Sequence, residues 1–463
     1  MMIKKYTGFV MVMIFATACQ VTKPYKRPEL VTQNLYRDSN SDDSTSISTI
    51  SWQNFFADTL LLKLISNGLE NNLDLKIALQ NIQVSKAAFQ QSRSALLPDL
   101  SGNTSIRQSK LAFPQGYGII SSTTQYDLGL SASWEADIWG KLRSAKKGAL
   151  AGLLASEETR KTIQTQLIAD ISGYYYTLLA LDKQLRILEK TKENRIAGVS
   201  TVKALKEANI VNGAAIVQSE ANQYAAEIAI PVVKRQIRET ENAINLLLAL
   251  PSQQVIRGSL DAQTINVDLH TGIPSQLLQN RPDVKLAEYN LMIAFENTNV
   301  AKTMFYPALH LTAAGGFTSF SLKDWLTSRG LFGNVAAGLT QPIFNKGLNK
   351  ARLATATARQ EQAALDFQKS LLVAGQEVSN ALYAYQTALE QQAIRGKQVQ
   401  ALEKAVDFNK KLLKYSSATN YTDVLTSEQN LLASQMEGVN DKLQQWQAVI
   451  TLYRALGGGA KQP

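Results

Sequence analysis

The sequence contains one cysteine and two histidines, and no long apolar run follows its first 18 residues. A single thiol excludes an intramolecular disulfide and a metal site built from cysteines. Beyond residue 18 no apolar run reaches the roughly 20 residues that a membrane-spanning helix needs. The mean hydropathy of −0.13 also excludes a bundle of transmembrane helices.

Patterns that would support catalysis are missing as well. The sequence has no Gly-x-Ser-x-Gly elbow, phosphate-binding loop or dinucleotide fingerprint. Neither His270 nor His310 has metal-ligand spacing around it. We therefore expect a protein that is not an enzyme and that carries no cofactor or metal.

The formal charge is +10, but basic and acidic residues alternate along the helical segments, as they do from Glu189 to Arg195. No basic patch is interleaved with aromatic residues. This pattern indicates solvated helix faces rather than a nucleic-acid-binding surface.

The first residues form a targeting segment. Lys4 and Lys5 precede an apolar stretch at residues 8–15, and Ala16-Thr17-Ala18-Cys19 ends in the only cysteine of the chain. We interpret residues 1–18 as a signal peptide and Cys19 as the lipidation site of a bacterial lipoprotein, anchored by acyl chains such as palmitate. An ordinary signal peptide followed by an incidental cysteine is the alternative. Residues 19–50 are poor in apolar side chains and are expected to form a tether.

An internal duplication organises the rest of the chain. Residues 73–100 align without gaps with residues 282–309, at a constant offset of 209. The identical pairs are Asp74/Asp283, Lys76/Lys285, Ala78/Ala287, Asn81/Asn290, Pro98/Pro307 and Leu100/Leu309. Apolar or small residues recur in heptad spacing in both copies. In the first copy these slots are Leu75, Ala78, Ile82, Ser85, Phe89, Ser92 and Leu96.

Each repeat is expected to hold a helix, a β-hairpin, a long helix and a return helix. The first repeat, 51–251, predicts a helix over 52–97 broken near Asn71-Asn72, strands at 98–113 and 126–138, and helices at 141–206 and 214–250. A polar connector follows at 252–273. The second repeat, 274–456, predicts a helix over 282–306, strands at 308–319 and 333–343, and helices at 348–415 and from 421 to 456. A flexible tail covers 457–463.

The strands have one apolar and one polar face and suit a tilted transmembrane strand of about 9–11 residues. Two hairpins have open edges and cannot close a sheet in lipid, so closure requires several copies of the chain.

The ordered motifs of the chain resemble TolC/OprM-type outer-membrane factors of the lipoprotein branch. The matching segments are Pro24-Tyr25-Lys26-Arg27-Pro28, Trp52 to Leu75, Trp134 to Arg143, Arg281 to Glu288, Leu339 to Phe344 and Tyr421 to Leu425. The resemblance covers nearly the whole chain beyond the signal peptide.

The resemblance implies an α+β fold that is mostly α. Long antiparallel helices would form one third of a trimeric α-barrel, and four strands per protomer would contribute to a shared transmembrane β-barrel. It implies a homotrimeric exit duct in the bacterial outer membrane, extending into the periplasm. Its partners would be a periplasmic adaptor and an inner-membrane pump, and its role efflux, as in multidrug resistance. The sequence does not name the cargo among drugs, metals, solvents and proteins.

A non-conducting periplasmic coiled-coil scaffold lipoprotein is the alternative function. The two amphipathic hairpins distinguish the possibilities, because a scaffold needs no such strands.

The resemblance also implies that the breaks at 207–213 and 416–421 are periplasmic tips that narrow the pore and meet the adaptor. Plain helix-hairpin turns are the alternative. The candidate tip residues are Ala208, Asn209, Asn212, Gly213, Ser417, Thr419 and Tyr421, and the candidate aperture residues are Glu220, Asp423, Thr426 and Glu428. The familiar ionic lock is not expected here, because Thr426 and Gln429 replace the usual aspartate and arginine.

Overall fold

The computed structural model describes residues 21–29, 35, 46–110, 112, 122–265, 276–415 and 421–460. Cys19, Ser417 and Thr419 therefore lie outside the described residues. The chain divides into two compact units. Unit 1 comprises Met1–Glu29, Asn81–Glu157 and Leu286–Gln368, and unit 2 comprises Leu30–Gln80, Glu158–Lys285 and Lys369–Pro463.

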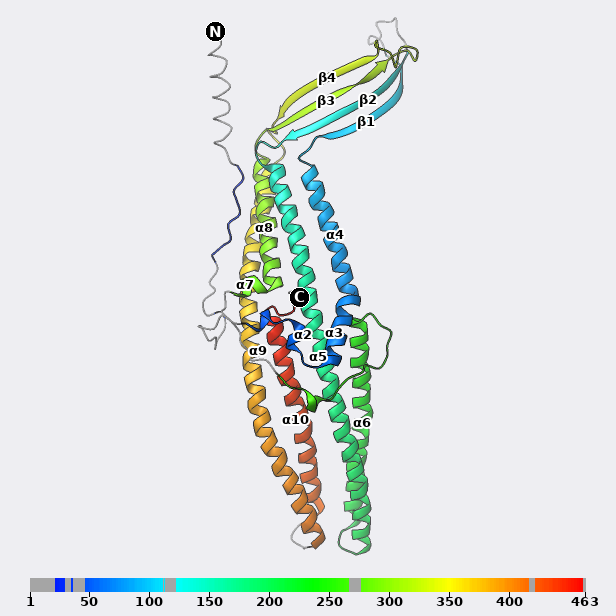
Figure 1. Cartoon of the computed structure of the whole chain (residues 1–463), viewed down its shortest axis with the longest axis vertical. Helices are drawn as coiled ribbons and strands as arrows, with labels where there is room; N and C mark the ends of the chain where they lie inside the picture. Colours follow the sequence, from blue (N-terminus) through cyan, green and yellow to red (C-terminus); the bar gives the residue numbers. More distant parts are fainter. Residues whose placement is uncertain are drawn as a thin grey trace. The chain divides into compact units, whose positions relative to one another are not determined.

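The principal elements follow the order that the duplication predicts (Figure 1). In the first repeat they are α2 (Trp52–Phe55), α3 (Thr59–Asn71), α4 (Leu73–Ser94), β1 (Asp99–Lys110), β2 (Ser122–Ala136), α5 (Lys141–Glu207) and α6 (Gly213–Leu247). In the second they are α7 (Leu277–Asn280), α8 (Pro282–Thr303), β3 (Ala308–Ser319), β4 (Leu331–Thr340), α9 (Leu348–Tyr415) and α10 (Tyr421–Ala455). The mostly helical fold with four strands is thereby confirmed.

Several boundaries differ from the sequence-based expectation. The first helix is also broken before Thr59, where the Asp58 carboxylate caps α3 by accepting a hydrogen bond from the Leu60 amide at 2.8 Å. β4 ends at Thr340 rather than residue 343, because Pro342 has no amide hydrogen to donate to a sheet. α8 ends at Thr303, a few residues before Pro307, which disfavours helix in the residue preceding it.

The described residues of unit 1 include one antiparallel sheet with the strand order β1-β2-β3-β4 (Figure 1). Each hairpin pairs within itself, and β2 of the first repeat pairs with β3 of the second. Leu128 on β2, for example, lies opposite Thr104 on β1 and Phe317 on β3. The two repeats therefore build one sheet rather than two.

The register places apolar side chains of all four strands on the same face of this sheet. Its members include Leu100, Ile106, Leu128, Leu130, Trp134, Leu309, Leu311, Phe317, Leu331, Val335 and Leu339. On the opposite face Asp127 accepts hydrogen bonds from Thr318 at 2.7 Å and Ser105 at 3.2 Å. The apolar face is open to its surroundings, since the exposed fraction is 60% for Leu130 and 83% for Val335.

Both outer strands have a free edge within the described part of the chain. β1 pairs there with β2 alone, and β4 with β3 alone. The outer edges of β1 and β4 therefore present unpaired amide and carbonyl groups that another strand can bond.

Two indoles bond the segments that connect the sheet to the helices of unit 1. Trp134 donates a hydrogen bond from Nε1 to the Leu96 carbonyl at 3.0 Å, and Trp139 donates to the Pro307 carbonyl at 2.8 Å. Trp139 also packs on Tyr306 with ring centroids 5.0 Å apart. Because Trp139 and Pro307 belong to different repeats, this contact joins the two hairpins at their helical ends.

In unit 2 each long helix folds back against its return helix. Lys203 and Lys192 of α5 pair with Glu220 and Glu227 of α6, so the helices are antiparallel. α9 and α10 are also antiparallel, because Lys410 pairs with Glu428 and Arg395 with Asp441. Pro231 lies inside α6, as the sequence indicated.

Aromatic residues form part of the core of unit 2. The rings of Tyr176 and Trp446 stack with centroids 4.2 Å apart, and Tyr176 is 1% exposed. The hydroxyl of Tyr175 donates to the Asp58 carboxylate at 2.6 Å. Burial, reinforced by the hydrogen bond to Asp58, raises the pKa of Tyr175 above its ordinary value.

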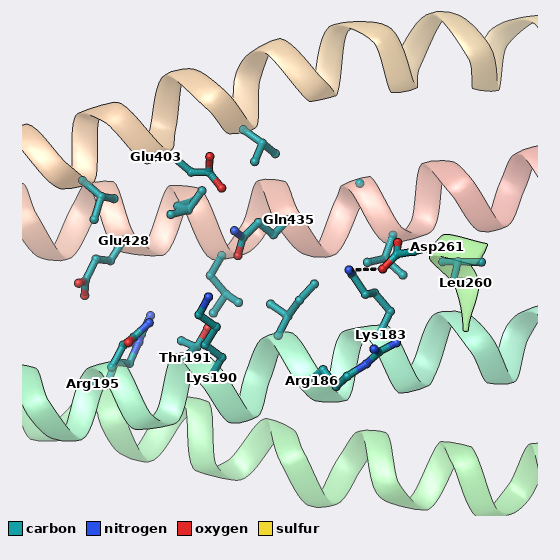
Figure 2. A pocket seen from close by; sticks show the side chains of 18 of the residues that line it. Lys183, Arg186, Lys190, Thr191, Arg195, Leu260, Asp261, Glu403, Glu428 and Gln435 are labelled. Atoms are coloured by element: carbon teal, nitrogen blue, oxygen red, sulfur yellow. Dashed lines mark hydrogen bonds and ion pairs between the residues drawn. The ribbon is translucent and has the colours of Figure 1, made fainter. Parts of the chain in front are cut away.

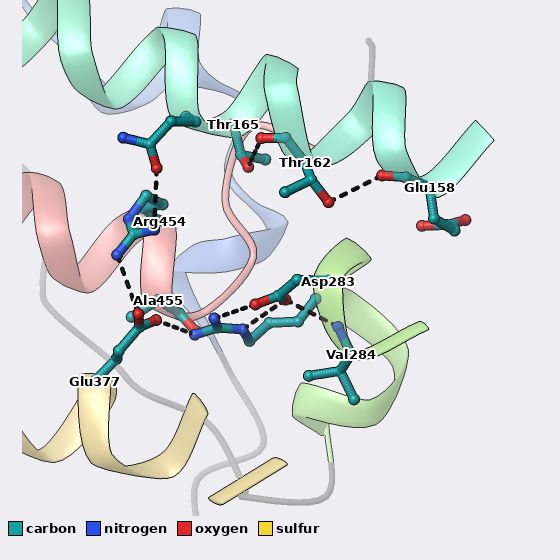
Figure 3. A network of polar contacts seen from close by, with 10 residues as sticks. Glu158, Thr162, Thr165, Asp283, Val284, Glu377, Arg454 and Ala455 are labelled. Atoms are coloured by element: carbon teal, nitrogen blue, oxygen red, sulfur yellow. Dashed lines mark hydrogen bonds and ion pairs between the residues drawn. The ribbon is translucent and has the colours of Figure 1, made fainter. Parts of the chain in front are cut away.

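The buried Arg281 connects residues of three helices within unit 2, and Figure 3 shows its partners Asp283, Glu377 and Ala455. Arg281 donates to Glu377 of α9 at 2.7 Å and to the Ala455 carbonyl of α10 at 2.8 Å. It also pairs with Asp283 of α8. Burial opposes ionisation of Asp283, but the hydrogen bonds and charge of Arg281 prevail and lower the pKa of Asp283.

In the described part of the chain no helix is both long enough and apolar enough to cross a membrane.

Candidate functional site

The turn between α5 and α6 combines small and polar residues with the apolar Ile210 and Val211. Asn209 has a φ of 59°, a left-handed conformation that asparagine tolerates better than most residues. Asn212 caps α6, since its side chain accepts a hydrogen bond from the Ala215 amide at 3.2 Å. Ala208, Asn209, Asn212 and Gly213 are all exposed. These candidate tip residues are therefore free of packing within the chain.

Tyr421 begins α10 and contacts the other hairpin. Its hydroxyl donates to the Ser219 hydroxyl of α6 at 2.7 Å. Burial raises the pKa of Tyr421, with a further contribution from the nearby Glu428 carboxylate. Tyr421 thus links the two hairpins close to their turns.

A second link follows about two turns along α10. Gln429 donates from Nε2 to Oδ1 of Asn222 at 2.9 Å, and Arg195 of α5 donates to the Asn222 carbonyl at 2.6 Å. These two hydrogen bonds between α6 and α10 are therefore made by uncharged side chains. Gln429, the position at which the resemblance implies arginine, here makes a neutral hydrogen bond.

The candidate aperture residues lie on the first turns of the return helices. Glu220 pairs with Lys203 at 3.0 Å and Glu428 with Lys410 at 2.7 Å, so each binds a lysine of its own hairpin. Asp423 and Thr426 are exposed, and the Asp423 carbonyl accepts a hydrogen bond from Asn409 at 3.3 Å.

Sequence reasoning did not identify Ser219, Asn222 or Arg195 as contact residues. A signal was present for Arg195, which lies seven residues from both Leu188 and Val202. Those two residues are 3% and 0% exposed, and Arg195 is 8% exposed. A charged residue at the heptad position of buried neighbours predicts a specific polar contact.

Residues 21–29 run along α8 in unit 1, opposite to its chain direction. Lys23 exchanges backbone hydrogen bonds with the Asn299 side chain at 3.3 and 2.9 Å. Arg27 forms two hydrogen bonds with Glu288, each 2.6 Å long. The tether is therefore held in place over several residues.

Tyr25 packs edge-on against Phe295 between these two contacts. Its burial, aided by the charge of Glu288, raises the pKa of Tyr25 to about 12. Thr22 lies beside Gly140, just before α5 begins. This end of the tether is the one closer in sequence to Cys19.

Among the described residues no group of three or more His, Cys, Asp or Glu side chains is placed to hold a metal ion. The arrangement instead offers an amphipathic sheet with open edges and two linked helical hairpins.

Comparison with known proteins gives consistent results. The family model described as outer membrane efflux protein matches residues 64–250 and 273–458. The toluene efflux pump outer membrane protein TtgF of Pseudomonas putida is 29% identical over 464 residues, covering 96% of this chain and 94% of TtgF. The probable outer membrane lipoprotein SilC of Salmonella typhimurium is 28% identical over 456 residues, covering 97% of each chain.

The fold agrees with a solved structure of this type. The open state of the Neisseria gonorrhoeae MtrE outer membrane channel superposes with a TM-score of 0.85 at 26% identity, over 96% of this chain and 99% of that one. The two matches of the family model together cover well over half of the chain. The chain therefore belongs to the outer membrane efflux protein family, and it is the outer-membrane channel of an efflux system.

Proposed function

We propose that this protein is a homotrimeric, passive exit duct that carries small molecules from a periplasmic adaptor to the cell exterior. The observation that carries this proposal is the four-stranded sheet, with its exposed apolar face and two open edges. In lipid, unpaired backbone groups are too costly to remain at a sheet edge. Another copy of the chain, offering the same edges, completes the pairing.

Three copies would supply twelve strands, an even number within the range of known outer-membrane barrels. The apolar face would meet lipid, and the face carrying Asp127, Thr318 and Ser105 would line water. A channel lined in this way selects weakly, so we infer drugs or other small molecules as cargo. Transport energy would come from an inner-membrane pump.

We also propose that Cys19 carries the lipid anchor. The contacts of Lys23 and Arg27 with α8 hold the tether on unit 1, with the Cys19 end toward the start of α5. An acylated Cys19 would then enter the membrane that holds the sheet.

The exposed turns are proposed as the adaptor contact and periplasmic constriction. The tip set is Ala208, Asn209, Asn212, Gly213, Ser417, Thr419 and Tyr421, and the aperture set is Glu220, Asp423, Thr426 and Glu428. The support is the exposure of the first turn and the direct links between the two hairpins.

The test measures both the assembly of trimers and the conduction of ions. Outer-membrane fractions should yield trimers that migrate intact on gels without heating, and the purified protein should conduct ions in planar bilayers. Deleting the gene should raise sensitivity to part of a panel of drugs, detergents and metals. A monomer without conductance, found in the inner-membrane fraction, would instead support the scaffold lipoprotein.

A further inference from the structure

A cavity of about 590 Å³ lies in unit 2, well within the size range of small-molecule sites (Figure 2). Its walls come from α5, α9 and α10, and the short 3-10 turn Leu260–Ala262 closes one end. Lys183 and Arg195, near its two ends, are twelve residues apart on α5, which corresponds to about 18 Å along a helix. The cavity is therefore elongated along the helices.

Cations outnumber anions on its walls. The basic residues are Lys183, Arg186, Lys190, Arg195, Lys410 and Lys442, and the acidic residues are Asp261, Glu403 and Glu428. Two of the three carboxylates are neutralised, because Asp261 pairs with Lys183 at 2.6 Å and Glu428 with Lys410 at 2.7 Å. The hydrogen bond from Lys183, with the charges of Lys442 and Arg186, lowers the pKa of Asp261. The cavity therefore favours negative charge.

Arg195 provides an unused donor at one end of the cavity. The residue is 8% exposed, and its one hydrogen bond among the described contacts runs from Nη1 to the Asn222 carbonyl. Its Nε has no acceptor in the described structure, and neither has Nδ2 of Asn222. Leaving a buried charged group incompletely paired is costly, so the Arg195 guanidinium, whose side chain lines the cavity, gains from an anion bound beside it.

The remaining wall is largely apolar. Its side chains are Ile187, Leu260, Val399, Val406, Leu431, Leu432 and Val439, together with the uncharged polar residues Thr191, Asn194 and Gln435. Figure 2 shows Arg195 and Lys190 toward one end on the α5 side, and Lys183 with Asp261 toward the other. An inorganic anion would leave the apolar wall unused, whereas an amphipathic anion uses both surfaces.

We propose that this cavity binds an amphipathic organic anion. A carboxylate or sulfonate head pairs with the Arg195 guanidinium and the Lys190 ammonium, and the hydrocarbon body lies against Leu431, Leu432 and Val406. This site is separate from the conducting role, and it would exist whether or not the trimer conducts.

The test uses decanoate as the probe and the full-length protein in nanodiscs, with empty nanodiscs as the blank. Isothermal titration calorimetry should show saturable binding of decanoate at one site per chain. Decyltrimethylammonium, which has the same tail and the opposite charge, should show none.

Two variants locate the head group. Arg195→Gln and Lys190→Glu should each weaken decanoate binding about tenfold or more, the usual effect of losing a charge-assisted contact. Arg235→Gln is the matched control, because Arg235 is exposed on α6 and does not line the cavity. This variant should bind decanoate with the same affinity as the unmodified protein. Lys190 is also exposed, so its substitution tests the site without disturbing a buried contact.

Equal affinity in Lys190→Glu and the unmodified protein would overturn the proposal. So would the absence of saturable decanoate binding, or equal binding of the cationic amphiphile.

Discussion

Uncharged side chains join the two helical hairpins of unit 2 near their turns. Tyr421 bonds Ser219, and Gln429 bonds Asn222. Hydrogen bonds between neutral groups respond little to ionic strength, whereas exposed ion pairs are screened by salt. The raised pKa of Tyr421 keeps its hydroxyl protonated below the ordinary phenol value of about 10, and deprotonation weakens the link only above that pH.

We predict that Tyr421→Phe raises the conductance of the resting channel in planar bilayers. The substitution removes one link and leaves the buried Ser219 hydroxyl without its donor, at a cost of about 1 kcal/mol. The increase should be similar at low and high salt.

Tyr415→Phe is the control, since Tyr415 ends α9 and is 75% exposed. Unchanged conductance in Tyr421→Phe would show that this link does not hold the hairpins together at the constriction.

At the scale of elements, periodicity in the sequence predicted the faces of helices and strands well. Along residues 81–96 the half-buried positions include all the expected heptad slots, from Ile82 through Phe89 to Leu96. The alternation in β2 likewise matches the observed sheet faces. Both succeed because a side chain's direction depends on local backbone geometry.

The sheet faces can be tested at two adjacent positions. Val335→Lys places a charge on the apolar face of β4 and should cost about 2–4 kcal/mol per chain if that face meets the middle of the bilayer. We expect less heat-resistant trimer in the outer-membrane fraction.

Asn334→Lys adds the same charge to the neighbouring residue, which is exposed on the opposite face, and should assemble normally. Equal trimer yields from both variants would contradict the assignment of the lipid-facing side.

At the scale of the whole molecule, the two repeats complete one another. β2 pairs with β3 across the repeat boundary in unit 1. In unit 2, Tyr176 of the first repeat stacks on Trp446 of the second. Each repeat on its own would keep its hairpin but lose the β2–β3 pairing and part of its core packing.

A fragment of residues 1–251 should therefore fail to fold. It loses β3, one of the two strands that pair with β2, and the Trp446 ring that stacks on Tyr176. We expect rapid degradation in limited proteolysis and no trimers. The control is the full chain cut after folding at a protease site inserted after Ile265. This cut chain should remain assembled, and a protease-resistant 1–251 fragment would show that the repeats are independent.

The sequence by itself determined the order of elements, the duplication, the faces of the helices and strands, and the places where the hairpins turn. These follow from residues that are neighbours along the chain, whose backbone preferences are local. Only the tertiary structure decided that β2 pairs with β3, that Tyr421 bonds Ser219, and that Nε of Arg195 has no acceptor among the described residues. Those features depend on distances between side chains far apart in sequence, which packing alone establishes.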